Sequence, residues 1–435
     1  MKAESKRYGI LVGGGPAPGI NSVISSVTIE ATKRGHTVIG IYDGFKHLMD
    51  GNTKIEFLTI PKVTRIHRRG GSILHTSRAN PTKNDVHLRN TVETLKDIGI
   101  THLVTIGGDD TLFSATTVAE YSRKYLNHEL SFCHVPKTID NDLPLPAGVP
   151  TFGFETARSE GARMVSTYFT DARATGRWFV VVAMGRKTGH LALGIGKSAS
   201  ATLTLIPEEF PNRISLPLIV DTIAGSVIKR MAMGRPHGVA IVAEGFLEFL
   251  NEEELKRLLT AHQFIEHDEH GHLRLSELNF SDILKFALRK RLSEFGIDLR
   301  VIDQEIGYEL RCVPPCAFDI DYTRNLGFGA VDFLENGGSN AMITIQGDKF
   351  VPMTFQELQD AETGKTRIRA VDTDSLSFRI AREYMIRLNR SDLDNAETLR
   401  RLASSAHVSP EQFKQEFEHI LTDYEPVEPV PIEAV

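Results

Sequence analysis

Six short apolar segments that end at glycine, proline or aspartate are the strongest constraint on the fold. They are rich in valine and isoleucine and alternate with segments of helical periodicity. Strands of this kind are typically buried on both faces of a parallel sheet whose crossover connections are helices. The pattern predicts an α/β protein with doubly wound sheets, with ligands at the carboxyl ends of the strands. The segments are YGILVGGG, TVIGIYDG, THLVTIGGDD, SFCHVPKT, RWFVVVAMGR and HGVAIVAEGF.

Length and charge narrow the classes of function. The chain has 435 residues, enough for two or three domains or for one enzyme with two lobes. Its net charge of -6 provides no global basic field for nucleic acid or an anionic membrane. The sequence contains no apolar run of about 18 residues, so it predicts no membrane span. Three cysteines without a disulfide framework favour a cytoplasmic setting. Any phosphate must therefore be held locally.

The glycine-rich loop VGGGPAPGIN, residues 12–21, joins the first predicted strand to an apolar-periodic helix. Glycines let a phosphate approach the backbone, and the amide groups of a helix start favour its charge. The loop is not a Rossmann fingerprint, because Pro18 stands where the third glycine should be, and it is not a Walker A loop. Taken alone, it is compatible with phosphate binding and with a structural turn.

Two adjacent carboxylates, Asp109 and Asp110, follow the strand in VTIGGDDTLF, where a helix is expected to begin. Asp110 or Thr111 could cap that helix, a role that suits both residue types. A cap explains only one of the two carboxylates. Asp109 could instead hold Mg²⁺, because Mg²⁺ takes one or two carboxylates together with phosphate and water.

A third strand end, VPKTIDNDLPLP at 135–146, combines Lys137 and Thr138 with Asp140 and Asp142. Lysine is a point charge for phosphate, and a carboxylate among cations is a candidate general base. The alternative is a turn stabilised by Asx hydrogen bonds, which the DND sequence also suits. Three such edges in one sheet favour a ligand site.

Two further strand ends carry charged residues. VAMGRKTGHLAL at 182–193 presents Arg186 and Lys187, and VAEGF presents Glu244. Fixed cations suit phosphoryl transfer, and a carboxylate can accept sugar hydroxyls. Either could equally be a solvated surface group.

Taken together, the motifs resemble those of the phosphofructokinase family. GGPAPGIN, GGSILHTSR, GGDDT, PKTIDND, MGRKTGHLAL, AEG and GYELR occur in the family's order and at about its spacing, over residues 8 to about 330. The resemblance implies two doubly wound Rossmann-like lobes with mainly parallel sheets and an active site in the cleft between them. The lobes implied are a donor lobe at 1–145, completed by part of 310–390, a sugar-phosphate lobe at 146–309 with a helical insert at about 251–300, and a helical and flexible tail at 391–435.

The resemblance also implies roles for individual residues. Asp140 matches the base that takes the proton from the 1-hydroxyl of fructose 6-phosphate, Arg186 the cation that stabilises the transition state, and Asp109 the Mg²⁺ ligand. Arg177 matches a substrate contact usually provided by a neighbouring subunit, which implies a homodimer or homotetramer. The implied donor contacts are Gly14, Gly15, Arg78, Gly108 and Lys137, and the further catalytic positions are Lys137, Asp110, Thr138 and Asp142. The implied sugar contacts are Thr138, Ile139, Asp140, Arg177, Met184, Gly185, Arg186, Glu244, Tyr308 and Arg311.

Two departures from the ATP-using members of the family predict the phosphoryl donor. Asp110 and Lys137 stand where most ATP enzymes have glycine, and the pyrophosphate-dependent branch has aspartate and lysine there. An aspartate at 110 crowds and repels the α-phosphate of ATP, while Lys137 adds charge for a small anionic donor. Tyr308, where many ATP enzymes have histidine, fits the same branch. The alternatives are an ATP-dependent 6-phosphofructokinase and a catalytically silent, phosphosugar-binding regulatory subunit.

Overall fold

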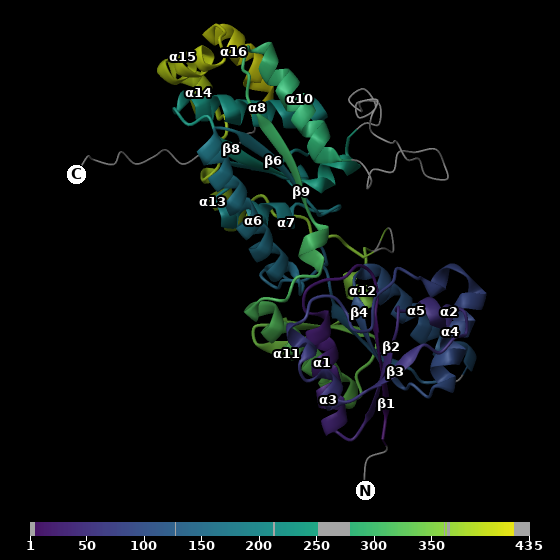
Figure 1. Cartoon of the computed structure of the whole chain (residues 1–435). Helices are drawn as coiled ribbons and strands as arrows, with labels where there is room; N and C mark the ends of the chain where they lie inside the picture. The colour runs from purple at the N-terminus through teal and green to yellow at the C-terminus, as the bar shows by residue number, and fades with distance from the viewer. Residues whose placement is uncertain are drawn as a thin grey trace. The chain divides into compact units, whose positions relative to one another are not determined.

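The chain forms two compact units, each assembled from two separate stretches of sequence. Unit 1 is Met1–Ala157 with Tyr308–Arg369, and unit 2 is Arg158–Gly307 with Ala370–Val435 (Figure 1). The computed structural model describes residues 5–126, 128–211, 214–250, 279–360, 362 and 366–421. None of the helices among these residues is long and apolar enough to cross a membrane.

Unit 1 is built on a seven-stranded sheet in the order β11-β10-β5-β4-β1-β2-β3. The central strands pair in parallel, and the edge strands β3 and β11 pair antiparallel to β2 and β10. The strands are β1 (Arg7–Val12), β2 (Thr37–Ile41), β3 (Ile55–Leu58), β4 (His102–Gly107), β5 (Ser131–Pro136), β10 (Ala341–Gln346) and β11 (Lys349–Thr354).

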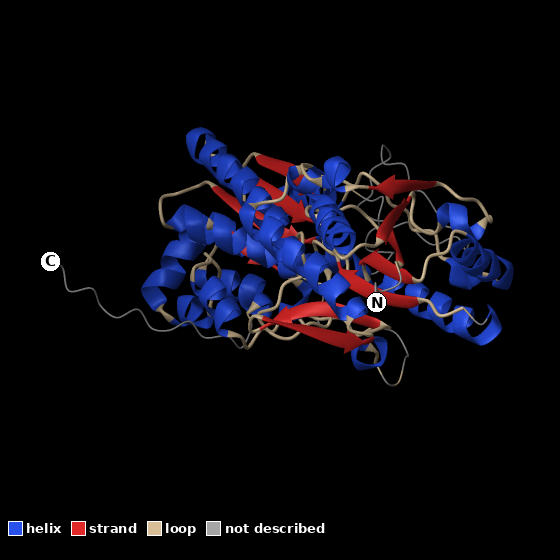
Figure 2. Cartoon of the chain, turned by 90° about the horizontal axis from the view of Figure 1, so that it is seen from below, coloured by secondary structure: helices blue, strands red, loops and turns tan. Residues whose placement is uncertain are grey.

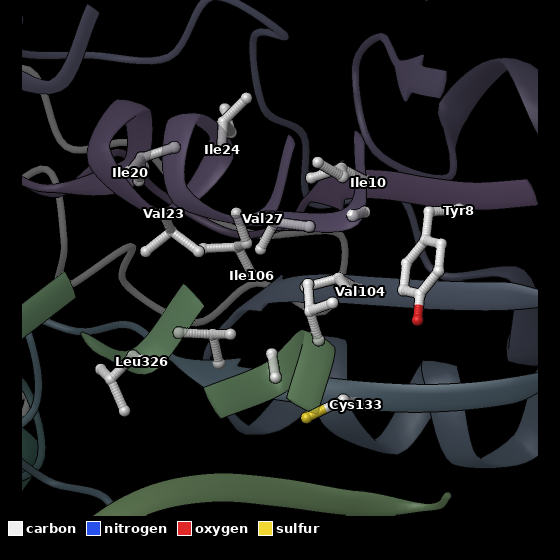
Figure 3. Packing of buried hydrophobic residues seen from close by; sticks show 14 of the residues in the cluster. Tyr8, Ile10, Ile20, Val23, Ile24, Val27, Val104, Ile106, Cys133 and Leu326 are labelled. Carbon is white, nitrogen blue, oxygen red and sulfur yellow. The ribbon is translucent and has the colours of Figure 1, made fainter. Parts of the chain in front are cut away.

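Helices cover both faces of this sheet, as expected for a doubly wound fold. Helices α1 and α11 pack on one face, where Val27 and Leu326 meet Ile10, Val104 and Cys133 of the strands (Figure 3). Helices α4 and α5 pack on the other face. The helical segments of unit 1 are α1 (Ile20–Lys33), α2 (Lys46–Met49), α3 (Ile60–Val63), η1 (Ile66–Arg68), η2 (Pro81–Lys83), α4 (Asp85–Asp97), α5 (Asp109–Leu126), η6 (Tyr308–Arg311), α11 (Ala317–Glu335) and α12 (Phe355–Leu358).

Unit 2 contains a four-stranded, all-parallel sheet in the order β7-β8-β6-β9. Every residue of β6 and β8 is buried, which explains why these strands are continuous apolar runs in the sequence. Figure 2 shows strands flanked by helices. The strands are β6 (Trp178–Ala183), β7 (Leu203–Leu205), β8 (Gly238–Ala243) and β9 (Val301–Ile306). The helical segments are α6 (Phe154–Thr175, whose first residues belong to unit 1), α7 (His190–Ala199), η3 (Pro207–Glu209), α8 (Leu216–Ala232), η4 (Glu244–Glu248), α10 (Phe280–Glu294), α13 (Leu376–Glu383), α14 (Arg390–Asp394), α15 (Ala396–Ser405), α16 (Pro410–Phe417) and η7 (Glu418–Ile420).

The division into units differs from the predicted one in two places. Unit 1 continues past residue 145 because the buried Asp319 carboxylate accepts hydrogen bonds from the backbone of Gly153 and Thr156, at 2.8 and 2.7 Å. The C-terminal helices belong to unit 2, where Lys229 of α8 binds Asp392 at 2.6 Å. Residues 251–278 of the predicted insert and 422–435 of the predicted tail lie outside the described residues.

Candidate active site

The first glycine loop is tied to the loop at residues 76–77. Gly14 adopts a left-handed conformation with φ of 80°, and its N–H donates to Ser77 O at 2.8 Å. The Thr76 hydroxyl donates to Gly14 O at 2.7 Å. A Cβ on Gly13 would lie 2.3 Å from Thr111 Oγ1, so only glycine lets the loop approach the start of α5. The loop is therefore held against the second predicted phosphate edge.

Helix α5 begins at Asp109, which makes the capping interpretation of Asp110 and Thr111 wrong. The N–H groups of Thr111 and Leu112 already donate to Gly108 O, at 3.2 and 3.1 Å, so both residues 110 and 111 lie in the first turn. The Thr111 side chain is buried against the glycine loop, and Asp110 is exposed. Asp109 Oδ1 accepts a hydrogen bond from Asp110 N at 2.9 Å. Both carboxylates thus lie at the positive end of the helix dipole.

Lys137 is a buried cation at the end of β5. The residue is 5% exposed, and Nζ donates to Gly15 O at 2.5 Å. Burial and, after it, the Arg311 guanidinium lower the pKa of Lys137 to about 8, and the carboxylates of Asp140 and Asp142 oppose the change. The ammonium group can therefore contribute positive charge to an anionic ligand at this strand end.

His134 joins the strand ends that carry Asp109 and Lys137, and sequence reasoning missed it. Its ring is buried, with Nδ1 at 2.9 Å from Thr105 Oγ1 and Nε2 at 2.9 Å from Gly107 O. Burial lowers the pKa of His134 to about 3, so the ring is neutral. Because a carbonyl oxygen only accepts, Nε2 carries the proton. A histidine inside the apolar strand SFCHVP, three residues before the lysine, was the available signal.

The predicted base lies in the loop after β5. Thr138 Oγ1 accepts a hydrogen bond from Asp140 N at 3.0 Å, and Thr138 O accepts one from the Thr151 hydroxyl at 2.7 Å. Ile139 is only 4% exposed, so its side chain is buried in the protein. Asn141 has a left-handed φ of 57°, which turns the chain directly after the base.

Arg311 adds a second cation to the same part of unit 1. Its guanidinium lies 4.9 Å from the centroid of the Tyr308 ring, and a Cβ on Gly15 would lie 3.6 Å from Arg311 Cζ. Tyr308 and Arg78 are both exposed. The positive field of Arg78 also lowers the pKa of Lys137, as that of Arg311 does. Unit 1 therefore groups three cations around the first glycine loop.

The predicted sugar contacts of unit 2 follow two neighbouring strands. Met184, Gly185 and Arg186 come after β6, and Glu244 comes after β8, which pairs with β6 in parallel. Glu244 Oε2 accepts a hydrogen bond from Gly185 N at 3.0 Å. Arg186 is exposed and binds Glu248 at 2.8 Å. These side chains form one cluster at the carboxyl edge of the sheet.

Arg177 lies at the opposite end of β6 from this cluster. It immediately precedes the strand, and its Nε donates to Thr175 Oγ1 at 2.5 Å. A strand of 6 residues spans about 20 Å. Within one chain, the fold therefore separates Arg177 from Arg186, as expected if Arg177 serves the site of a neighbouring subunit.

The donor atoms at the start of α5 fit a metal ion whose other ligands are phosphate oxygens of the substrate and water. Among the described residues, no group of three or more histidine, cysteine, aspartate or glutamate side chains could hold a metal ion. Asp109 supplies hard oxygen at this position, beside the glycine loop. A single carboxylate is compatible with Mg²⁺, which keeps waters and binds phosphate oxygens.

Comparison with known proteins identifies the family. A family model described as Phosphofructokinase matches residues 7–334. The chain belongs to the phosphofructokinase family. The pyrophosphate–fructose 6-phosphate 1-phosphotransferase of Thermotoga maritima is 52% identical over 419 residues, 95% of this chain and 99% of that protein. The protein of the same name from Naegleria fowleri is 49% identical over 422 residues, 95% of each chain.

The solved structures support the family fold. The crystal structure described as pyrophosphate-dependent phosphofructokinase from Marinobacter aquaeolei matches with a TM-score of 0.65. The match covers 93% of this chain and 92% of that chain at 15% identity, so it bears on the fold alone. The predicted phosphofructokinase family and the predicted α/β fold with mainly parallel sheets are confirmed. The roles of individual residues stay predictions.

Proposed function

We propose that this phosphofructokinase transfers a phosphoryl group reversibly from pyrophosphate to the 1-hydroxyl of fructose 6-phosphate. The products are fructose 1,6-bisphosphate and phosphate. The observation that carries the proposal is Lys137, a buried cation bonded to Gly15 of the first glycine loop. A lysine at this position provides concentrated positive charge for a small, highly anionic donor. The two relatives with about half of their residues identical to this chain carry the name of this activity.

Asp140 is proposed as the general base. It removes the proton from the sugar 1-hydroxyl as the oxygen attacks phosphorus in line. Thr138 orients the base loop through its hydrogen bond from Asp140 N. Lys137 and Arg186 stabilise negative charge on the donor and on the transition state, and the backbone at Gly14 receives the donor. Asp109 would hold Mg²⁺, which would neutralise further charge on the phosphate oxygens.

Asp110 is proposed to select the donor. It is exposed in the first turn of α5, and it does not cap the helix. Its charge therefore serves no helix-start hydrogen bond of the kind that an N-cap makes. A carboxylate there repels the α-phosphate of ATP, a group that the compact pyrophosphate lacks.

Residues of unit 2 are proposed to bind fructose 6-phosphate. Glu244 accepts sugar hydroxyls, Arg186 provides a cation, and Arg177 serves a neighbouring subunit. This assignment requires a homodimer or homotetramer. The proposal is tested by mixing Arg177→Ala and Asp140→Ala subunits, because hybrids regain active sites only if the two residues come from different chains. Mass spectrometry of the mixture shows whether the subunits have exchanged, and exchange without recovery of activity would place both residues in the site of one chain.

The proposed setting is the cytoplasm. The three cysteines are Cys133, Cys312 and Cys316, and all of them are free thiols, as expected in a reducing compartment. Localisation of a tagged full-length chain in its own cells tests this assignment.

A donor assay is the decisive experiment. Purified protein is incubated with Mg²⁺, fructose 6-phosphate and either pyrophosphate or ATP, and fructose 1,6-bisphosphate is measured. We expect turnover with pyrophosphate and little or none with ATP. Asp140→Ala, prepared in the same way, controls for contaminating kinases. Turnover with ATP alone would overturn the proposed donor, and sugar binding without turnover on either donor would support a regulatory subunit.

A further inference from the structure

The geometry points to Arg369 as a positioning residue that holds the base-bearing loop, residues 138–151, in its reactive conformation. This inference rests on the proposed role of Asp140 as the base. Arg369 is the last residue of unit 1, and it lies beyond the region matched by the family model, which ends at residue 334. No motif in the sequence pointed to it.

The Arg369 guanidinium binds the backbone of the loop on several sides. Nε and Nη2 each donate to Asn141 O at 3.0 Å, and Nη1 donates to Val149 O at 2.7 Å. Nη1 also lies 3.3 Å from Leu145 O and 3.5 Å from Pro146 O. One planar side chain thus ties the beginning of the loop to its far end. Lysine has no such fork and cannot reproduce these bonds.

Main-chain pairing reinforces the side-chain contacts. Arg369 N donates to Asp142 O at 2.9 Å, so the segment at residue 369 is fixed against the loop by backbone as well as side chain. The Asp142 carboxylate also balances part of the Arg369 charge. The guanidinium is therefore held in one position against the loop.

Asn141 is the point at which this clamp acts on the base. It directly follows Asp140 and has a left-handed φ of 57°, which asparagine tolerates better than most residues. Asn141 Oδ1 accepts hydrogen bonds from Arg369 Nη2 and, at 3.0 Å, from Thr151 N. Without these bonds the backbone at Asn141 can relax to a commoner conformation, and the direction of the Asp140 carboxylate changes with it.

Loss of the clamp should lower turnover more than it lowers donor binding. The donor contacts at Gly14 and Lys137 are made by other loops or precede the turn at Asn141. A displacement of about 1 Å between reacting groups costs about 10²-fold in rate. We therefore expect Arg369→Met to lower kcat about 30- to 100-fold, with KM for pyrophosphate changed less than about threefold.

The test compares Arg369→Met with Arg367→Met. Arg367 is an exposed arginine in the same segment, and its Nη2 donates to Glu357 O at 2.5 Å, away from the base loop. Both variants are assayed under conditions in which circular dichroism shows that they are folded. Amide exchange of residues 138–151 is measured by mass spectrometry without substrates. We expect faster exchange and the kcat loss in Arg369→Met only. Equal kcat values for the two variants, or unchanged exchange in the loop, would overturn the proposal.

A second pair of variants keeps the test independent of gross misfolding. Asn141→Gly retains access to the left-handed conformation but loses the Oδ1 bonds, whereas Asn141→Ala also strains the backbone. We expect a larger kcat loss for alanine than for glycine. The losses in the double variant of Arg369→Met with Asn141→Gly should be less than multiplicative, because both residues act on one turn. Fully multiplicative losses would contradict a shared clamp.

Failure of the proposed donor is distinguishable from failure of this inference. The wild type is assayed first with pyrophosphate and with ATP, and inactivity with pyrophosphate overturns the donor alone. The ratios of kcat between each variant and the wild type are then measured with the donor that supports turnover. If no donor supports turnover, the base role of Asp140 fails, and the positioning role that depends on it is overturned with it.

Discussion

Replacing Lys137 with methionine should abolish pyrophosphate-dependent turnover and yet spare, or even raise, the stability of the free protein. Methionine fills a similar volume without the charge. A buried residue usually destabilises a protein by several kcal/mol when it is replaced, so the expected sign is unusual. It follows from the environment of Lys137, which has neighbouring cations in Arg311 and Arg78 and is buried from water.

The magnitude follows from the pKa of Lys137, which is about 8 in the fold against an ordinary 10.5. At about 1.4 kcal/mol for each pKa unit, carrying the proton costs the folded state about 3 kcal/mol below pH 8. Methionine removes this cost, but it also leaves Gly15 O without the hydrogen bond from Nζ, which costs about 1–3 kcal/mol. We therefore expect Lys137→Met at pH 7 to range from unchanged to about 2 kcal/mol more stable.

The pH dependence gives the sharper test. Because the folded pKa is lowered, the stabilisation is complete above pH 10.5 and is lost as the pH falls through 8. Between pH 7 and 9.5 the wild type should gain about 2 kcal/mol of unfolding free energy relative to Lys137→Met. Urea unfolding of both proteins at several pH values measures this difference. Parallel pH profiles, or a variant destabilised by more than about 2 kcal/mol at pH 7, would refute the reasoning.

Three further substitutions test the site. Asp140→Ala should lower kcat by about 10²–10⁴-fold, at the upper end because an alcohol is a poor nucleophile; near-normal turnover in a steady-state assay would exclude it as the base. Asp110→Gly should raise the ratio of ATP to pyrophosphate turnover, and an unchanged ratio would remove its role in donor selection. His134→Leu leaves the buried Thr105 hydroxyl without its hydrogen-bond acceptor and should destabilise the fold by about 1–3 kcal/mol. Because the pKa of His134 falls from 6.5 to about 3 in the fold, the wild type should lose stability more steeply than His134→Leu as pH drops below 6.5, which acid unfolding monitored by fluorescence measures.

Local patterns predicted the strands of both sheets well, whereas residues that act over long sequence distances escaped prediction. All six apolar segments form strands, β1, β2, β4, β5, β6 and β8, because burial on both faces leaves a continuous signal. The capping interpretation at the start of α5 was wrong because aspartate is a common cap. Only the hydrogen bonds of the first turn show that Gly108 precedes the helix. Arg369 contacts a loop more than two hundred residues earlier, and no local pattern encodes such a pairing.

The interleaved composition of unit 1 has a consequence for how the chain is made. Strand β10 (Ala341–Gln346) pairs with β5, and α11 packs beside α1 on one face of the sheet. The sheet therefore acquires its last pieces only after the first stretch of unit 2 has been synthesised. Until then β5 is an open edge, which is prone to pair with other chains. A nascent chain paused near Ala157 should therefore recruit chaperones that shield strand edges, and a gene fragment ending there should yield aggregates. A circular permutant that begins at Tyr308 and continues through a linker into residue 5 should instead complete this sheet early in translation.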